Sequence, residues 1–119
     1  MMLTVVAGAL LLSLVNSSPV NYAENPSVKR FQEYVQINTT TYNDLEPVVQ
    51  FWQRLADEAQ VSLSKYEFKE GMPVLVLKWP GRNSSLNSIM FNSHMDVVPA
   101  KETDGWTYPP FSGAAGARR

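Results

Sequence analysis

The residues best able to do chemistry are His94 and Asp96, two positions apart at the end of an apolar run. Imidazole is a good zinc ligand through either ring nitrogen. A carboxylate two residues on can accept the other ring N–H, which fixes the tautomer and makes the imidazole a better donor. The pair therefore indicates a candidate metal site in which His94 binds the ion and Asp96 supports His94.

The supply of further ligands is thin, because His94 is the only histidine and the chain has no cysteine. A zinc site needs three or four protein ligands, and the nearby candidates are Asp96, Glu102 and Asp104. The lack of cysteine excludes disulfides, Cys-ligated zinc and Cys nucleophiles. A His-x-Asp pair also occurs in surface turns and in structural hydrogen-bonded pairs, so that reading of His94 stays open.

A first helix is expected over residues 28–38. Ser27 is the expected cap, since its side chain can accept from first-turn amides. Val28, Phe31 and Val35 fall on one face of such a helix. The run of residues 38–41, Asn-Thr-Thr-Thr, ends it because β-branched and side-chain-bonding residues compete with helix.

A second helix is expected from about Asp44, with Pro47 in its first turn, where a missing amide costs nothing. Four residues form its apolar stripe: Val48, Trp52, Leu55 and Ala59. Four polar residues are expected to face water: Gln53, Arg54, Asp57 and Glu58. The pattern makes Trp52 a core residue.

Two strand-like stretches, 61–68 and 72–79, are separated by three residues ending in Gly71, and this spacing predicts a hairpin. The continuous apolar run 74–77 is typical of a strand covered on both faces. Trp79-Pro80-Gly81 ends the second stretch.

Residues 89–91 predict a third strand that ends just before His94. Functional groups in open α/β sheets gather beyond the carboxyl ends of strands, which is where His94 would stand. Two helices followed by three strands predict an α/β fold in which helices pack on a sheet.

Composition limits the class of protein. With 119 residues and a formal net charge of −1, the chain is one domain at most and has no basic patch for nucleic acid. Residues 3–15 are apolar apart from three positions, too short for a membrane span of about 20 residues but long enough for a signal-peptide core.

Residues 1–23 are therefore predicted to be a signal peptide, which implies secretion or an endomembrane lumen and no membrane contact after cleavage. An uncleaved anchor and a cytoplasmic location are the alternatives. The sequons Asn38-Thr39-Thr40 and Asn83-Ser84-Ser85 are compatible with secretion.

The stretch around the pair carries a wider likeness. Residues 92–100, NSHMDVVPA, resemble the first catalytic motif of the dinuclear-zinc aminoacylase and carboxypeptidase family, which is an apolar strand followed by Ser/Gly-His-x-Asp-Val-Val-Pro. Trp79-Pro80-Gly81 and Trp106-x-x-x-Pro110-Phe111 are similar to the aminoacylase branch in particular. The resemblance covers roughly residues 24–113.

The resemblance implies a three-layer α/β zinc-peptidase-like catalytic domain with a mixed sheet, of which residues 24–113 are the N-terminal part. It makes His94 a ligand of one of two zinc ions and Asp96 the catalytic carboxylate that buttresses it. Zinc pairs of this kind bind and acidify a bridging water. The implied reaction cleaves an N-acyl-L-amino acid to a carboxylate and a free amino acid, and a homodimer of the full-length protein is allowed.

In the family the remaining ligands, including the aspartate of a Gly-Arg-Gly-x-x-Asp segment, come later in the chain. Residues 114–119, AAGARR, do not follow that pattern, so a truncated domain, inactive alone, is expected. The alternatives are a metallo-carboxypeptidase or dipeptidase of the same family, a non-catalytic secreted binding scaffold, and an unrelated small α/β domain with a structural His94.

Overall fold

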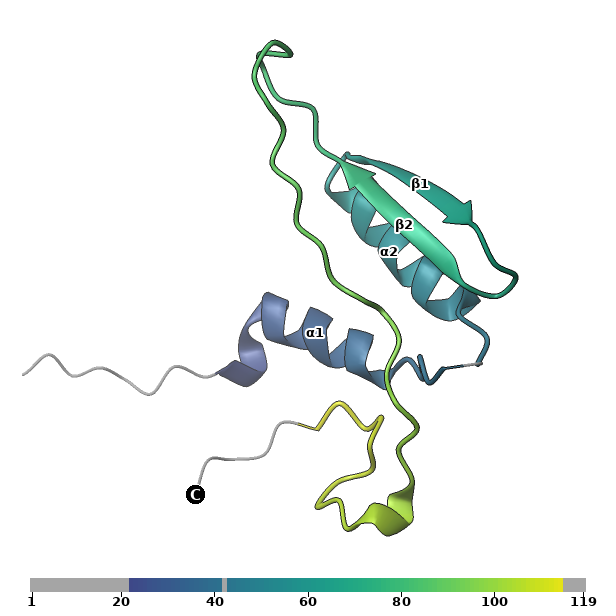
Figure 1. The fold of residues 1–119 in the computed structure, drawn as a ribbon. Coiled ribbons are helices and arrows are strands. Elements are labelled where there is room, and N and C mark those ends of the chain that lie inside the picture. The colour runs from purple at the N-terminus through teal and green to yellow at the C-terminus, as the bar shows by residue number, and fades with distance from the viewer. Residues whose placement is uncertain (1–21, 42, 115–119) are drawn as a thin grey trace, which may run out of the picture.

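The computed structural model describes residues 22–41 and 43–114. Figure 1 shows their arrangement, in which two helices precede a two-stranded hairpin. The elements in chain order are η1 (Tyr22–Glu24), α1 (Pro26–Gln36), α2 (Glu46–Glu58), β1 (Ser62–Glu67), β2 (Pro73–Lys78) and η2 (Glu102–Asp104). Within these ranges no helix has the length and apolar character needed to cross a membrane. The predicted signal peptide lies almost wholly outside the described residues and stays a prediction.

Helix α1 begins two residues earlier than expected, and its cap is Asn25 rather than Ser27. The Asn25 side chain accepts a hydrogen bond of 2.9 Å from the Ser27 amide. Pro26 explains the shift, since proline lacks an amide and has a φ suited to the first helical position. The helix ends at Gln36, before the Asn-Thr-Thr-Thr run, as predicted. Its predicted apolar face is poorly covered, and the Phe31 side chain is 65% exposed.

Helix α2 supplies the core of the described structure. Asp44 accepts from the Glu46 amide at 2.9 Å, and Pro47 lies in the first turn, so the predicted start is confirmed. The buried apolar residues are Val48, Val49, Phe51 and Ala56. The predicted stripe is only partly right, because Val48 is buried whereas Ala59 is exposed.

The buried residues of α2 differ from the predicted apolar stripe because two elements, the hairpin and α1, pack against this helix (Figure 1). The hairpin lies along one side of the helix (Figure 1), and the Tyr34 ring of α1 packs against two aromatic rings of α2. The centroid of Tyr34 is 5.3 Å from that of Phe51 and 5.6 Å from that of Trp52. A second neighbour widens the buried arc beyond the single face that periodicity predicts.

Strands β1 and β2 form the predicted antiparallel hairpin, with Leu63 opposite Leu77 and Lys65 opposite Leu75. Gly71 in the connection has φ 72°, the left-handed region that favours glycine. The face that includes Lys65 is turned to α2, because the Lys65 ammonium lies 3.0 Å from the Glu46 carboxylate. That hydrogen bond raises the pKa of Lys65 above its ordinary value of 10.5.

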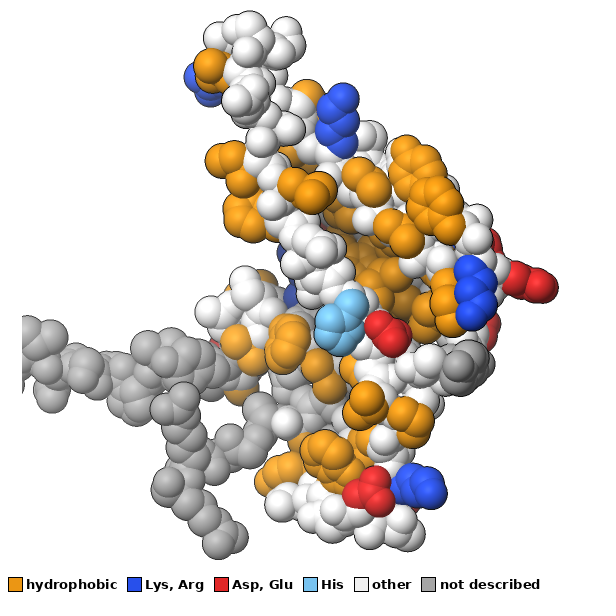
Figure 2. All heavy atoms as spheres, viewed as in Figure 1, with side chains coloured by type: hydrophobic (Ala, Val, Ile, Leu, Met, Phe, Trp, Pro, Cys, Tyr) orange, Lys and Arg blue, Asp and Glu red, His pale blue; other side chains and the backbone are white. Residues whose placement is uncertain are grey.

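The opposite face of the hairpin is exposed, which corrects the prediction that residues 74–77 are covered on both faces. Tyr66, Val74 and Val76 are each about half exposed, at 47–49%. Figure 2 shows hydrophobic side chains gathered over the hairpin. Only α2 packs on this sheet among the described residues, so alternate side chains of β2 remain at the surface.

The predicted third strand is absent from the described structure, and the sheet is a two-stranded antiparallel one rather than the expected mixed sheet. Ile89, Met90 and Phe91 run as extended chain without ladder hydrogen bonds and are 84–93% exposed. A strand exists only where a neighbouring backbone pairs with it. The first such pairing after β2 comes at Val97, which bridges to Thr40.

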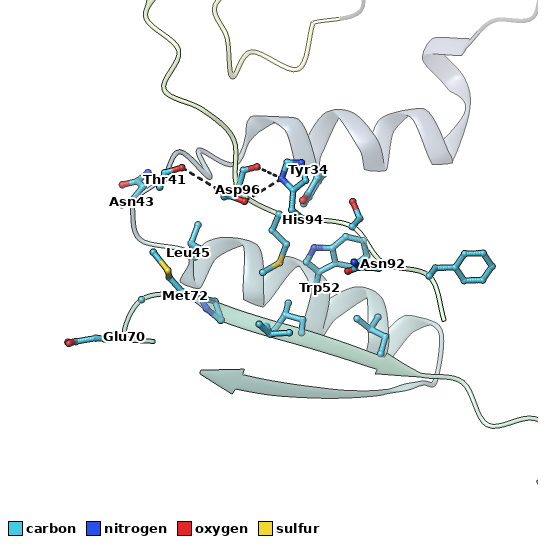
Figure 3. A pocket seen from close by; sticks show the side chains of 18 residues that line it. Tyr34, Thr41, Asn43, Leu45, Trp52, Glu70, Met72, Asn92, His94 and Asp96 are labelled. Carbon is cyan, nitrogen blue, oxygen red and sulfur yellow. Dashed lines mark hydrogen bonds and ion pairs between the residues drawn. The ribbon is translucent and has the colours of Figure 1, made fainter. Parts of the chain in front are cut away.

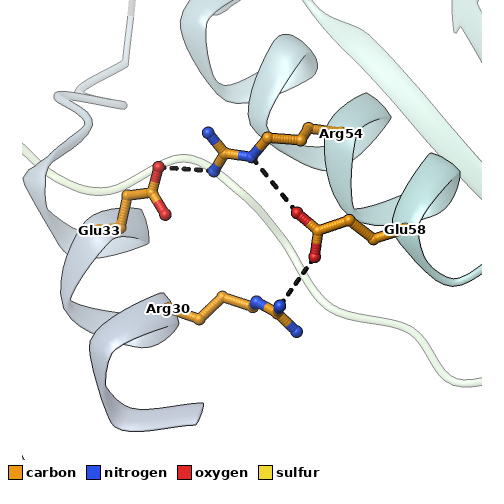
Figure 4. Close-up of polar contacts among 4 residues, drawn as sticks. All are labelled: Arg30, Glu33, Arg54 and Glu58. Atoms are coloured by element: carbon orange, nitrogen blue, oxygen red, sulfur yellow. Dashed lines mark hydrogen bonds and ion pairs between the residues drawn. The ribbon is translucent and has the colours of Figure 1, made fainter. Parts of the chain in front are cut away.

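Helices α1 and α2 are joined by charged side chains as well as by the aromatic contacts. Figure 4 shows the series, in which Arg54 contacts Glu33 at 2.5 Å and Glu58 at 3.9 Å, and Glu58 contacts Arg30 at 2.7 Å. All four side chains are about half exposed. Individual exposed pairs contribute little to stability, about 0–1 kcal/mol, so the series mainly fixes how the two helices are oriented.

The other side of α1 holds the chain near Gly113. The Gln32 amide donates to the Gly113 carbonyl at 2.8 Å, and the Gln36 amide donates to the Ser112 carbonyl at 3.1 Å. A Cβ atom at residue 113 would lie 2.8 Å from the Gln32 carbonyl oxygen. This approach needs glycine, and it fixes residues 112–113 against the helix.

Candidate active site

The loop that follows α1 positions the His94–Asp96 pair. Residue 97 forms a parallel bridge with residue 40, in which the Thr41 amide donates to the Val97 carbonyl at 3.1 Å and the Val97 amide donates to the Thr39 carbonyl at 3.0 Å. The Thr39 side chain is buried. The pair is therefore held by two backbone hydrogen bonds beside it, and not by the strand that the sequence predicts before it.

The His94 ring is oriented by Asp96. Its Nδ1 lies 2.7 Å from the Asp96 carbonyl oxygen and 3.3 Å from the carboxylate Oδ1. An Nδ1–H that donates to these oxygens leaves the lone pair on Nε2. The expected partnership is present, although the carbonyl oxygen is the nearer acceptor and the carboxylate the second.

The imidazole is open to solvent. The His94 side chain is 83% exposed, and Figure 2 shows the chain's single histidine on the surface. An exposed ring whose Nδ1 is engaged can offer Nε2 to a metal ion.

Thr41 adds a contact that the sequence did not identify. Its hydroxyl lies 3.3 Å from Asp96 Oδ2 and 3.4 Å from the Val97 carbonyl oxygen. The Asp96 carboxylate thus stands between Thr41 and His94 (Figure 3). No spacing rule links residues 41 and 96, and the only signal is that residues 39–41 form a β-branched run that favours extended pairing.

A groove of about 840 Å³ opens beside the pair, between α2, strand β2 and the segment 91–96. Trp52, Leu75 and Leu77 contribute its apolar wall, whereas Thr41 and Asp96 contribute polar groups near His94. Both Trp52 and His94 line the groove. In Figure 3 the His94 ring points toward Asp96 and Tyr34, whereas Trp52 lies on the other side of the segment that carries His94. Trp52 is therefore both half-buried in the core, as predicted, and part of a wall that a ligand could contact.

The indole N–H of Trp52 is buried and has no hydrogen-bond partner among residues 22–41 and 43–114. A buried donor without a partner costs about 1–3 kcal/mol. This N–H has almost no solvent-exposed area, so it is an unpaired donor of the core rather than a group on the open face of the groove.

The described residues do not complete a zinc site. No group of three or more His, Cys, Asp or Glu side chains in this part of the chain is arranged to hold a metal. Of the other candidates, Asp104 accepts from the Lys101 amide at 3.0 Å and caps helix η2. The structure therefore brings His94 and Asp96 together, but it does not join Glu102 or Asp104 to them.

Comparisons with known proteins agree with the motif. The chain is 40% identical over 91 residues to Aminoacylase-1 of Sus scrofa, which is 76% of this chain and 22% of that protein. It is 39% identical over 89 residues to Aminoacylase-1 of Homo sapiens. It is also 51% identical over 39 residues to the protein named "Probable carboxypeptidase S-like 2" of Dictyostelium discoideum, which is 33% of this chain. No family model matches the chain.

The chain spans about a fifth of the length of the aminoacylase relatives it matches. The match covers about three quarters of the chain. This share agrees with the range of roughly residues 24–113 over which the sequence resembles the aminoacylase and carboxypeptidase family. Together with the Ser-His-Met-Asp-Val-Val-Pro segment, these identities show that the chain belongs to the aminoacylase family.

Proposed function

We propose that the chain is part of a zinc-dependent amidohydrolase that cleaves N-acyl-L-amino acids to a carboxylate and a free amino acid. The observation that carries the proposal is the orientation of His94, whose Nδ1 is held by Asp96 at 2.7 Å while its ring stays exposed beside the groove. The similarity to Aminoacylase-1 supports the reaction type.

His94 would supply one zinc ligand through Nε2. Asp96 would hold the ring in the tautomer that frees Nε2, and its negative charge would make the imidazole a stronger donor. Thr41 would keep the Asp96 carboxylate in place through its hydroxyl. The remaining ligands of the two zinc ions would lie outside the described residues, so the described part is proposed to be inactive by itself.

The groove would take the substrate. Its apolar wall of Trp52, Leu75 and Leu77 would accommodate an apolar acyl chain or amino-acid side chain by removing it from water.

The wider architecture is part of the same proposal. The exposed face of the hairpin, with Tyr66, Val74 and Val76 about half exposed, supports a larger three-layer α/β domain in which further elements of the whole protein cover it. Residues 24–113 would be the N-terminal part of that domain, secretion would follow from residues 1–23, and the full-length protein would form a homodimer.

A second candidate is a metallo-carboxypeptidase or dipeptidase of the same family. It is favoured by the 51% identity over 39 residues to "Probable carboxypeptidase S-like 2". Both candidates hydrolyse an amide and would use His94 in the same way. They differ in the carbonyl side of that amide, which is a simple acyl group in one substrate and an amino acid with a free amino group in the other.

A chimera tests the proposal. Residues 24–113 would replace the matching region of pig Aminoacylase-1, and hydrolysis of N-acetyl-methionine and of a dipeptide would be measured with zinc present. The proposal expects hydrolysis of N-acetyl-methionine, and faster cleavage of the dipeptide would favour the second candidate. The isolated 119-residue chain is expected to show no turnover, and hydrolysis by that chain would contradict its inactivity.

Two variants of the chimera assign the roles. His94→Ala is expected to abolish zinc-dependent turnover, and Asp96→Asn to lower it about 10- to 100-fold, the usual effect of altering a residue behind a metal ligand. Glu102→Gln is the matched control and should keep activity, because Glu102 is an exposed acid that the structure does not join to His94. A His94→Ala chimera with full activity would contradict the proposal.

A further inference from the structure

The sequon Asn83-Ser84-Ser85 lies in the loop that follows β2, at the end of the molecule that stands uppermost in Figure 1. Every residue from Gly81 to Ile89 is exposed. The proposed amidohydrolase function makes no use of this loop. An Asn-x-Ser sequence is an acceptor for N-linked glycan where it forms a surface loop of a secreted protein.

The asparagine and the serine of this sequon are in direct contact. Asn83 Oδ1 accepts from the Ser85 hydroxyl at 2.7 Å and from the Ser85 amide at 3.0 Å. Both contacts use the oxygen of the Asn83 side chain. The amide nitrogen Nδ2 has no hydrogen-bond partner among the described residues, so the nitrogen that would carry a sugar is free.

The second sequon, Asn38-Thr39-Thr40, has the same internal contacts in a different setting. Asn38 Oδ1 accepts from the Thr40 hydroxyl at 2.6 Å and from the Thr40 amide at 3.1 Å. Thr39, however, is only 4% exposed, and Thr40 forms the bridge to Val97 that positions the His94–Asp96 pair. The Asn83 sequon is the one whose neighbours on both sides are all exposed.

The loop also exposes large apolar side chains to solvent. Trp79 and Leu86 on either side of Asn83 are 82% and 71% exposed. Large apolar side chains that gather at a surface invite association, and a glycan is bulky and solubilising. A sugar on Asn83 would shield this loop, and residues 81–89 do not line the groove beside His94.

We propose that Asn83 carries an N-linked glycan, acquired as residues 1–23 direct the chain into the secretory pathway. The donor is an oligosaccharide attached to a lipid through a pyrophosphate. Nδ2 of Asn83 attacks the anomeric carbon of the oligosaccharide, the bond from that carbon to the pyrophosphate oxygen breaks, the lipid pyrophosphate leaves, and Nδ2 loses one proton. The structure supports this site through the exposure of the loop and the free Nδ2.

The test expresses the full 119-residue chain in cultured animal cells and maps its peptides after N-glycosidase treatment in ¹⁸O-water. This treatment converts a glycosylated asparagine to labelled aspartate. The expected result is label at residue 83, lost in Ser85→Ala and retained in Ser85→Thr, which keeps the hydroxyl. Asn38→Gln is the matched control and should leave the label at residue 83 unchanged.

Three results would overturn the proposal. They are an unlabelled residue 83 in the unaltered chain, label confined to residue 38, and label at residue 83 that persists in Ser85→Ala. The Ser85 variants alter an exposed loop side chain that lies outside the aminoacylase site. Asn38 contacts Thr40 beside that site, so Asn38→Gln is used only for the label at residue 83. This label is read by peptide mapping, so the outcome is independent of whether the chimera is active.

Discussion

Substitution of Gly113 by alanine should release the end of the described chain from helix α1. Gly113 has φ 63°, and placing alanine in the left-handed region costs roughly 1–2 kcal/mol. The new Cβ would also lie 2.8 Å from the Gln32 carbonyl oxygen, so residue 113 must move away. That movement breaks the hydrogen bonds from Gln32 and Gln36, which contribute about 0.5–1.5 kcal/mol each. The total is about 2–5 kcal/mol against docking.

Gly71→Ala is the matched control, since Gly71 also has positive φ, 72°, but no atom lies within 4 Å of its added Cβ. It should cost only the backbone strain, roughly 1–2 kcal/mol. Amide hydrogen exchange followed by mass spectrometry would measure both variants. Gly113→Ala should speed exchange in peptides that cover residues 26–36 and 105–113, whereas Gly71→Ala should act on the hairpin. Equal exchange of the α1 peptides in the two variants would refute the reasoning.

Three further predictions concern stability. Val48→Ala should lower the free energy of unfolding by about 1–3 kcal/mol, because it removes two methyl groups from a site with 0% exposure. Urea titrations would measure this loss, and an effect under about 0.5 kcal/mol would contradict the assignment of Val48 to the core. Arg54→Ala should cost about 1 kcal/mol, and less at high salt, since it removes the exposed contacts with Glu33 and Glu58. A loss that is equal at low and high salt would argue against these ion pairs. The hydrogen bond to Glu46 raises the pKa of Lys65 above 10.5. The stabilisation that this bond gives should be complete below pH 10.5 and be lost as the pH rises through the raised pKa. Lys65→Met removes the titrating group, so it should flatten this alkaline loss of stability in a pH series of thermal melts.

The helices and the hairpin could be predicted from the sequence because their signals are local. Pro47 with the preceding Asp44 marks the start of α2, and Gly71 between two β-rich stretches marks the turn. The position of the first cap was wrong because Pro26 moved it to Asn25. Which side chains are buried depends on tertiary contacts that the local sequence does not specify. Phe51, for example, is buried because Tyr34 packs on it from another helix.

The strand predicted at residues 89–91, which the structure does not form, shows that local composition alone does not determine strand pairing. Ile, Met and Phe have the composition of a buried strand, but pairing depends on a neighbour that the sequence of the segment does not specify. The His94–Asp96 pair was predictable from its spacing, and its local geometry confirms that the two residues meet. Thr41 was not predictable, because its contact with Asp96 spans 55 positions of the chain.

The contacts of α1 imply an order of assembly. Helix α2 and the hairpin occupy residues 46–78 without interruption, so they can meet by closing short loops. The partners of α1 are distant in sequence, since Arg30 reaches Glu58 across 28 positions and Gln32 reaches Gly113 across 81. Long-range contacts form late and local units can open separately. Residues 46–78 should therefore act as the folding nucleus, and α1 should be the last helix to join it and the first to leave.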